Sequence, residues 1–311
     1  GLGGAVGGHG RGEGRGLVTG GGAREQGGAG ARAIQAGINY FDTAGRYGDG
    51  ESEKNLGRVL RSLKADVVVG TKFRLRAEDR GNVAAFVAQS TEESLHRMGR
   101  DHVDLLQLHN PLTGRDGGDD LDVEIALNEV APALEKLRRQ GKTGFIGFSG
   151  VGEPAALQKA VDSKLFDTVQ VVYNALNPSA GGPMPKGAPG LDYGRLLERA
   201  RAADIGTIVI RALAGGALSG TADRHPLAMQ QVPPIGSAPD FAGDVTRAQA
   251  LAPVAKEAGI ATLTELAERF VISHPAVSTM LVGYSTLGHL EEAIAAVGKG
   301  PLPKAVLERM G

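Results

Sequence analysis

The sequence contains no cysteine and no tryptophan, and only 4% of its 311 residues are aromatic. Without cysteine, disulfides and thiolate chemistry are excluded, and the composition fits a reducing compartment. No apolar run reaches the ~18 residues that predict a membrane span. The longest, IGTIVIRALAGGAL, is interrupted by Arg211, and no signal-peptide pattern opens the chain. We therefore expect a cytoplasmic enzyme or binding protein without a membrane partner.

The chain also lacks an excess of charge of either sign. It has 34 basic and 35 acidic residues, for a formal net charge of −1. This balance gives no electrostatic reason to expect a nucleic acid or an anionic membrane surface as partner. Hydrophobic residues make up 41% of the chain, which is enough to bury a full core. A small molecule is the expected partner, and the sequence leaves the oligomeric state open.

Glycine, in contrast, is abundant. The whole chain has 48 glycines, and their density is highest in the first thirty positions. The segment GRGEGRG allows two functional interpretations, an RGG-like arm for nucleic acid and a phosphate-binding loop. An RGG arm is normally longer, however, and no Gly-Lys-Ser/Thr follows. We therefore predict a flexible loop. The chain starts without methionine, so we also expect its N-terminus to be incomplete.

From residue 31 onward, short apolar runs alternate with helical patterns. Short apolar runs are typical of strands that are covered on both faces. With residues 1–6 as a further first strand, the pattern predicts a (β/α)8 or TIM barrel, with the active site at the C-terminal face of its strands. An open doubly wound sheet is the runner-up, but no strand is followed by a GxGxxG turn that opens a helix. The predicted strands are 38–42, 66–72, 103–109, 143–149, 168–173, 206–211 and 278–283, and the predicted helices are 51–63, 86–98, 123–140, 154–162, 192–203 and 262–273.

Three insertions rich in proline and glycine interrupt this alternation, at 111–122, 177–191 and 221–245. They follow the fourth, sixth and seventh strands of the predicted barrel, so we expect them to overhang its catalytic face. No linker divides the chain, and we predict a single domain over residues 1–311.

Polar residues close most of the predicted strands, and a barrel would bring these strand ends into one pocket. A lysine that closes the run VVVGT is costly to bury unless it meets a carboxylate, and Asp42 of the neighbouring strand is placed to supply one. A charged Lys72 would lower the pKa of Tyr47 from its reference value of ~10 toward working pH. His109 is placed to hydrogen-bond at the same reacting oxygen. The strand-end residues are Asp42, Lys72, His109, Ser149, Gln170, Asn174 and Arg211.

These residues lie within motifs that resemble the aldo-keto reductase superfamily across nearly the whole chain. The motifs are, in order, FDTAGRYGDGESEKNLG, VVVGTK, VDLLQLH, GKTGFIGFS and VQVVYN. The resemblance implies a (β/α)8 barrel that reduces carbonyls with hydride from NADP(H) or NAD(H). It makes Tyr47 the general acid, Lys72 its pKa partner, Asp42 the support of Lys72, and His109 the group that orients the carbonyl.

The resemblance also implies a set of cofactor-binding positions. Ser149 and Gln170 match residues that hold the nicotinamide carboxamide, although Gly150 stands where many members have Asn. Arg211 takes the place of an aromatic residue that stacks on the nicotinamide, so it is expected either to stack or to pair with a phosphate or an anionic substrate. The remaining positions are Leu213, Gly215, Gly216 and Leu218 at the pyrophosphate, and Gly283, Ser285, His289 and Glu292 at the adenosine end. Since His289 is the only basic residue at the 2′-phosphate position, NAD and NADP both stay open.

Three other interpretations carry less weight. The seven histidines form no HxH or HExxH pair, so no metal site is predicted. GFSGV departs from the GxSxG nucleophile elbow because Val151 stands where glycine is needed. The alternative to an enzyme is a nucleotide-binding regulatory or redox-sensing barrel, since some relatives of the superfamily attach to membrane channels. The complete set of Asp42, Tyr47, Lys72 and His109 favours catalysis, while the sequence leaves the substrate open.

Overall fold

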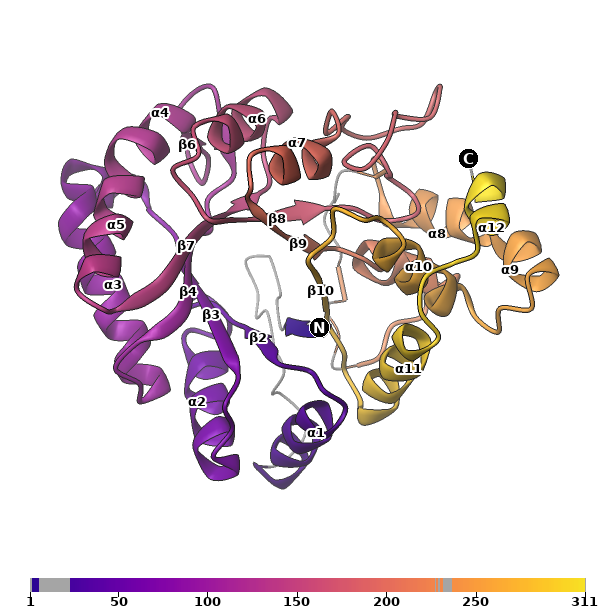
Figure 1. Cartoon of the computed structure of the whole chain (residues 1–311), viewed down its shortest axis with the longest axis horizontal. Helices are drawn as coiled ribbons and strands as arrows, with labels where there is room; N and C mark the ends of the chain where they lie inside the picture. The colour runs from indigo at the N-terminus through magenta and orange to yellow at the C-terminus, as the bar shows by residue number, and fades with distance from the viewer. Residues whose placement is uncertain (1, 6–22, 227, 229, 232–236, 311) are drawn as a thin grey trace.

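Eight parallel strands close into a barrel in the order β1-β10-β9-β8-β7-β4-β3-β2. The structure, a computed structural model, describes residues 2–5, 23–226, 228, 230–231 and 237–310. The helices lie outside the strands (Figure 1). The barrel strands are β1 (Leu2–Ala5), β2 (Tyr40–Asp42), β3 (Val68–Phe73), β4 (Val103–Leu108), β7 (Thr143–Gly150), β8 (Thr168–Val172), β9 (Gly206–Ile210) and β10 (Thr279–Val282). This confirms the predicted (β/α)8 barrel.

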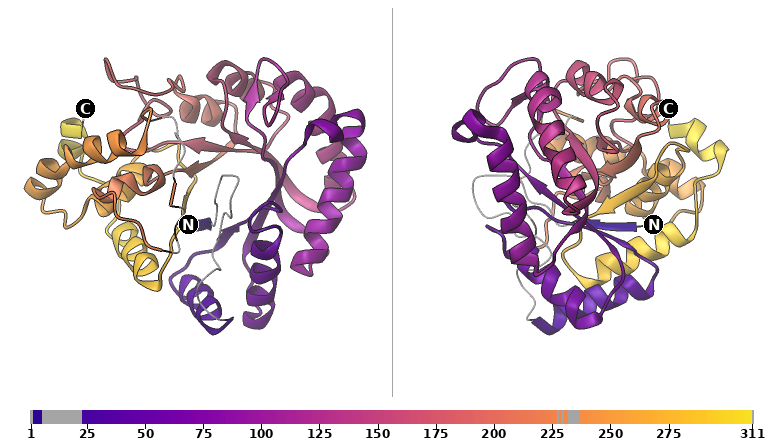
Figure 2. Two further views of the ribbon diagram at one scale, coloured as in Figure 1. Left: turned by 180° about the vertical axis from the view of Figure 1, so that it is seen from behind. Right: turned by 60° about the vertical axis from the view of Figure 1, so that its left-hand side comes forward.

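The short first strand closes the barrel. Gly3 of β1 lies in register with Tyr40 of β2 on one side and with Leu281 of β10 on the other. Figure 2 shows this strand at the centre of the molecule, between the first and the last part of the chain. The prediction of a strand within residues 1–6 is therefore confirmed.

The helices follow the strands in the alternating pattern that the sequence predicts. They are α1 (Ala23–Gln35), α2 (Glu51–Leu63), η1 (Ala77–Asn82), α3 (Val83–Met98), α4 (Val123–Ile125), η2 (Ala126–Val130), α5 (Ala131–Arg139), α6 (Pro154–Asp162), α7 (Leu196–Ala202), η3 (Ala214–Ser219), α8 (Phe241–Gln249), α9 (Ala252–Glu257), α10 (Leu263–Ile272), α11 (Leu287–Gly298) and α12 (Lys304–Met310). No helix in the described part of the chain has both the length and the apolarity needed to cross a membrane.

Two sequence predictions of local structure are wrong in part. The glycine-rich first thirty residues are not all loop, because α1 begins at Ala23; residues 6–22 lie outside the described part. The helix predicted from residue 192 begins only at Leu196, since Arg195 before it adopts a left-handed backbone with φ 57° that a helix cannot contain. At the second of these boundaries, composition suggested the helix but the backbone conformation of Arg195 set its start.

Side chains fill the interior of the barrel in layers. An apolar layer consists of Tyr40, Leu105, Ile208 and Leu281, each no more than 6% exposed. Because residues i and i+2 of a strand face the same side, Asp42 and Gln107 point into the barrel one step nearer to the C-terminal strand ends. The apolar layer thus forms the floor beneath a polar layer.

The insertions start at this C-terminal face, where they follow β4, β8 and β9. Residues 111–122 form a small two-stranded sheet, β5 (Leu112–Thr113) with β6 (Leu121–Asp122). Asp119 of this insertion pairs with Arg74, at 3.1 Å, just after β3, and with Arg46, at 3.7 Å, in the loop after β2. These ion pairs fix the insertion across the ends of neighbouring strands.

Candidate active site

The carboxylate of Asp42 is the centre of the polar layer. Its Oδ1 accepts hydrogen bonds from the Tyr40 hydroxyl at 2.8 Å, from Gln170 Nε2 at 3.0 Å and from Gln107 Nε2 at 3.2 Å. Its Oδ2 forms an ion pair with Lys72 Nζ, which also donates to the Thr43 carbonyl at 2.9 Å. A carboxylate that is 2% exposed needs such partners, because an unpaired buried charge is costly.

The loop that carries Tyr47 is held by hydrogen bonds made by its own sequence motif. Thr43 Oγ1 bonds to Ser52 Oγ at 2.8 Å, which ties the end of β2 to the start of α2. The fully buried Glu53 accepts from Thr71 of β3 at 2.6 Å and from Arg97 of α3 at 2.5 Å. Residues 48–50 all have positive φ, which turns the chain sharply after Tyr47. The GESEK segment therefore positions the phenol.

Tyr47, Lys72 and His109 lie together at the ends of three strands. Lys72 Nζ is 5.3 Å from the centre of the Tyr47 ring. The rings of Tyr47 and His109 meet edge to face, with their centres 5.7 Å apart. Each of the three side chains is at most 7% exposed. The structure thus brings together Asp42, Tyr47, Lys72 and His109, as the sequence predicts.

The pKa of Tyr47 differs in direction from the sequence expectation. Burial raises the pKa of the phenol and outweighs the positive charges of Lys72 and Arg211, which lower it. Burial also lowers the pKa of Lys72, but Asp42 and Tyr47 reverse this and leave it above its ordinary value. The prediction of a net lowered pKa for Tyr47 is therefore wrong for this site, because it counted the neighbouring charge but not the desolvation of the phenol.

The predicted nicotinamide positions form a polar strip on β7, β8 and the end of β9. Ser149 and Gln170 are neighbours in register, but the Gln170 amide nitrogen already donates to Asp42. The Ser149 hydroxyl is buried and has no hydrogen-bond partner in the described part of the chain. A Cβ added at Gly150 would lie 2.4 Å from the Gln170 carbonyl, so the backbone leaves no room for a side chain at this position. Arg211 follows β9 directly and is partly exposed.

The predicted pyrophosphate loop is the helical turn η3 after β9. Its glycines Gly215 and Gly216 have φ of 67° and 104°, a left-handed conformation that favours glycine. Leu213 precedes this turn, and Leu218 is buried in its core. Arg224 lies against the turn, where it donates to the Gly215 carbonyl at 2.9 Å and packs over the Phe241 ring.

The predicted adenosine residues surround the start of α11. Gly283 and Ser285 follow β10, His289 lies in the first turn of the helix, and Glu292 is exposed one turn later. The rings of His289 and His225 are 6.2 Å apart, so the insertion after β9 reaches this helix. Their roles toward a cofactor stay predictions.

Four residues of the site escaped the sequence reasoning. Tyr40 contacts Asp42 from the same strand, β2, and Gln107 contacts it from β4. Tyr193 lies beside Arg211, and Arg224 lies on the glycine turn. Tyr40 and Gln107 each stand two residues before a predicted strand-end residue. Because residues i and i+2 of a strand face the same side, the sequence could have indicated both. Nothing in the sequence signals the other two residues, since Tyr193 falls in the predicted helix 192–203 and Arg224 in the insertion 221–245.

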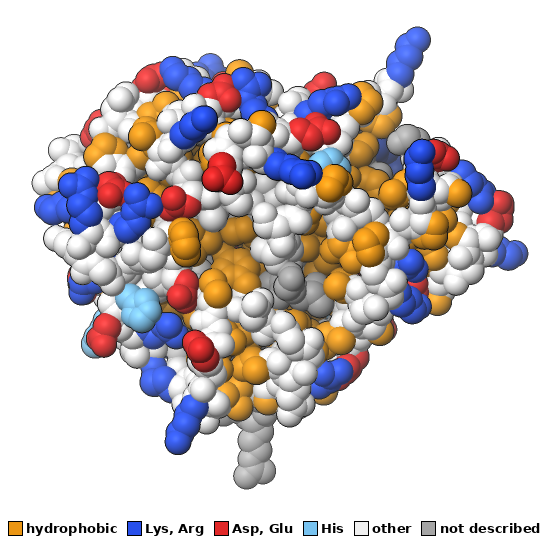
Figure 3. Space-filling view, in the orientation of Figure 1, with side chains coloured by type: hydrophobic (Ala, Val, Ile, Leu, Met, Phe, Trp, Pro, Cys, Tyr) orange, Lys and Arg blue, Asp and Glu red, His pale blue; other side chains and the backbone are white. Residues whose placement is uncertain are grey.

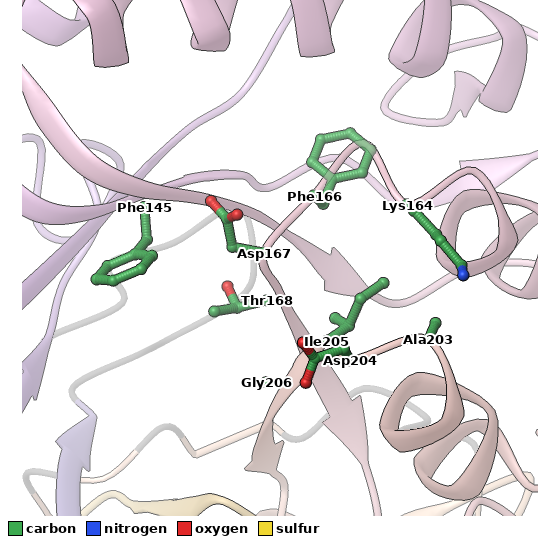
Figure 4. A pocket seen from close by; sticks show the side chains of 9 residues that line it. All are labelled: Phe145, Lys164, Phe166, Asp167, Thr168, Ala203, Asp204, Ile205 and Gly206. Atoms are coloured by element: carbon green, nitrogen blue, oxygen red, sulfur yellow. The ribbon is translucent and has the colours of Figure 1, made fainter.

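Other parts of the described structure offer less chemistry. No group of acidic or histidine side chains suited to a metal ion occurs within it. A pocket at the opposite, N-terminal end of the strands contains none of the predicted site residues (Figure 4). It is lined by Phe145, Lys164, Phe166, Asp167, Thr168, Ala203, Asp204, Ile205 and Gly206. On the face shown in Figure 3, basic and acidic side chains are interspersed.

Comparisons with known proteins agree with this geometry. A closed (β/α)8 barrel with Asp, Tyr, Lys and His at its strand ends defines an oxidoreductase class, and the model of the Aldo/keto reductase family matches residues 25–310. The chain belongs to this family. It is 32% identical to L-galactose dehydrogenase of Arabidopsis thaliana over 85% of this chain and 75% of that protein.

Two solved structures share the fold. The holo form of aldo-keto reductase AKR11C1 from Bacillus halodurans aligns with a TM-score of 0.70 at 20% identity, covering 95% of this chain and 90% of that one. An aldo/keto reductase from Klebsiella pneumoniae, solved with NADP and acetate, aligns with a TM-score of 0.64 at 22% identity, covering 93% and 84% of the two chains.

Proposed function

We propose that this protein is an NAD(P)-dependent oxidoreductase that interconverts an aldehyde or ketone with an alcohol, with Tyr47 as general acid and base. The proposal rests on the buried cluster of Tyr47, Lys72 and His109. This cluster adjoins Asp42, whose carboxylate accepts several hydrogen bonds and pairs with Lys72. A protein that only bound nucleotide would not need a phenol, a lysine and an imidazole around one point.

In the direction of reduction, Tyr47 donates its hydroxyl proton to the carbonyl oxygen. Its raised pKa keeps the proton on the phenol until that oxygen becomes basic. Lys72, fixed by Asp42 and the Thr43 carbonyl, stabilises the phenolate that remains. His109 lies at the edge of the Tyr47 ring and orients the same oxygen. In the direction of oxidation, the phenolate takes the proton back from the alcohol.

The residues of the barrel mouth fit a nicotinamide dinucleotide, which would supply or accept the hydride. The buried Ser149 hydroxyl is available for the carboxamide group. The turn with Gly215 and Gly216 lies at the position expected for the pyrophosphate, and Arg224, bonded to the Gly215 carbonyl, adds a positive charge there. His289, at the start of α11, is the basic group nearest to the predicted 2′-phosphate position, so NAD(H) and NADP(H) are both to be assayed. NADP is the cofactor in the Klebsiella pneumoniae structure.

The test is steady-state turnover of aldehydes and sugars, followed by nicotinamide absorbance. Tyr47→Phe is expected to lower kcat by a factor on the order of 100 to 10,000, as the loss of a general acid does, while the cofactor Kd stays unchanged. Tyr173→Phe is the matched control, because this other buried tyrosine packs against Phe270. Cofactor binding without turnover of any substrate would instead support a regulatory or redox-sensing barrel.

A further inference from the structure

Arg211 adopts a backbone conformation that is unfavourable for any residue except glycine. Its φ is 58°, in the left-handed region that residues with a Cβ rarely adopt. The Arg211 carbonyl is held by the side chain of Asn174, at 3.0 Å, and by the amide of Ala214, at 2.8 Å. Asn174 is fully buried and is itself fixed, because its oxygen accepts from the amides of Leu176 and Asn177. Such strain, maintained by buried partners, is typical of functional sites.

Arg211 directly follows β9 at the C-terminal face of the barrel, where its charge reaches the Tyr47 phenol. Its charge acts on Tyr47 and on Tyr193, the two groups that interact with it electrostatically. Burial raises the pKa of both phenols, so both keep their protons at neutral pH and supply no negative charge. Neither of these two phenols therefore compensates the charge of the Arg211 guanidinium.

No ion pair in the described part of the chain includes Arg211. This distinguishes it from other arginines whose side chains are similarly covered. Arg97 pairs with Glu53, Arg80 with Asp116, and Arg269 with Glu265. Burial lowers the pKa of Arg211, which means that its charge is only partly compensated. A desolvated cation of this kind is stabilised when a ligand provides the anion.

We propose that Arg211 binds a carboxylate of the substrate, so that the preferred substrates are aldehydes or ketones that carry an acid group, and the corresponding hydroxy acids. The inference rests on the proposed carbonyl–alcohol activity. A guanidinium presents a planar pair of donors that matches a carboxylate. Stacking on the nicotinamide fits less well, because the oxidised ring is itself a cation and would repel Arg211.

The test compares two isosteric pairs of aldehydes, in which only one member is charged. These are glyoxylate with methylglyoxal, and succinic semialdehyde with 4-oxopentanal. In the native protein, kcat/KM is expected to favour the charged member of at least one pair. Arg211→Met is expected to reduce this preference by about 10- to 100-fold, the effect of one hydrogen bond to a charged group, mostly through KM. Arg211→Lys is expected to restore part of it. Because each ratio is compared between proteins, hydration of the aldehydes cancels.

The control is Arg115→Met, which removes an exposed arginine from the insertion after β4 and is expected to leave the preference unchanged. An unchanged preference in Arg211→Met overturns the inference. If the cofactor Kd increases at the same time, Arg211 pairs with a cofactor phosphate instead. In either case, continued turnover leaves the proposed function standing.

Absence of turnover by the native protein would refute the proposed function but would not decide the role of Arg211. In that case, calorimetry tests the role of Arg211. Binding of benzoate is measured, and binding of the neutral benzamide serves as the uncharged comparison. Benzoate binding that is lost in Arg211→Met supports the carboxylate site, and equal binding by both proteins refutes it.

Discussion

Replacing Glu268 by glutamine is expected to stabilise the protein strongly at alkaline pH. Glu268 lies on α10, is fully buried, and neither of its carboxylate oxygens has a hydrogen-bond partner in the described part of the chain. Burial, together with the negative charges of Glu292 and Glu265, raises its pKa from the ordinary 4.5 to about 8. The folded protein therefore holds this proton more tightly than the unfolded chain.

The sign and size of the effect follow from this difference. Below pH 4.5 the carboxyl is protonated in both states and costs no ionisation energy. As pH rises from there to 8, only the unfolded chain releases the proton freely, so stability is lost. At 1.36 kcal/mol per pKa unit, the loss is on the order of 5 kcal/mol above pH 8 and about 3 kcal/mol at pH 7. Glutamine has the same shape and no charge, so it removes this loss.

The assay is denaturant unfolding of the native protein and Glu268→Gln at pH 5, 7 and 9. The two midpoints are expected to be close at pH 5 and to separate progressively at pH 7 and 9. Glu265→Gln is a comparison on the same helix rather than an independent control, because the charge of Glu265 contributes to the raised pKa of Glu268. Burial raises the pKa of Glu265, but hydrogen bonds from Lys299 and Arg269 outweigh this and lower it, so its substitution is expected to destabilise the protein at pH 7. A Glu268→Gln effect that is equal at all three pH values would refute the reasoning.

Two further predictions concern the reaction. Lys72→Met is expected to abolish turnover, because it removes the cation that stabilises the Tyr47 phenolate. Circular dichroism is expected to show an unchanged fold. Retained activity would exclude Lys72 from the mechanism. For alcohol oxidation, kcat/KM is expected to increase with pH up to and beyond the ordinary phenol pKa of 10, because burial raises the pKa of Tyr47 and the reaction needs its phenolate. A plateau below pH 9 would contradict this.

The sequence was sufficient to predict the barrel and the clustering of Asp42, Tyr47, Lys72 and His109. Each apolar run is short and ends in a polar residue, and parallel strands deliver their C-terminal ends to one face. The position of Lys72 beside Asp42 follows from this arrangement alone. The same reasoning could not find Tyr193, because the sequence predicts that this residue lies in the helix 192–203, whereas it precedes α7, which begins only at Leu196.

The sequence was insufficient for properties that depend on the depth of burial. The pKa of Tyr47 is the clearest example, since two cations near it are visible in the sequence but the covering of the phenol is not. Gln170 is another, because its amide could serve a cofactor or Asp42, and only the packing of the barrel interior shows that it bonds to Asp42. The close packing at Gly70 also depends on burial and could not be predicted from the sequence. A Cβ added there would lie 2.6 Å from the Tyr40 hydroxyl.

The balance of charge around Tyr47 links the proposed reaction to the proposed substrate. The charge of Lys72 is compensated by Asp42, whereas that of Arg211 is not compensated by any ion pair in the described residues. An acidic substrate would therefore bring the pocket close to neutrality when it binds. Neutralising Arg211 removes one of the charges that lower the pKa of Tyr47, so the phenol holds its proton more firmly. Substrate binding would thus help Tyr47 to keep its proton until the carbonyl oxygen develops negative charge. At that moment the reduction requires transfer of this proton to the oxygen.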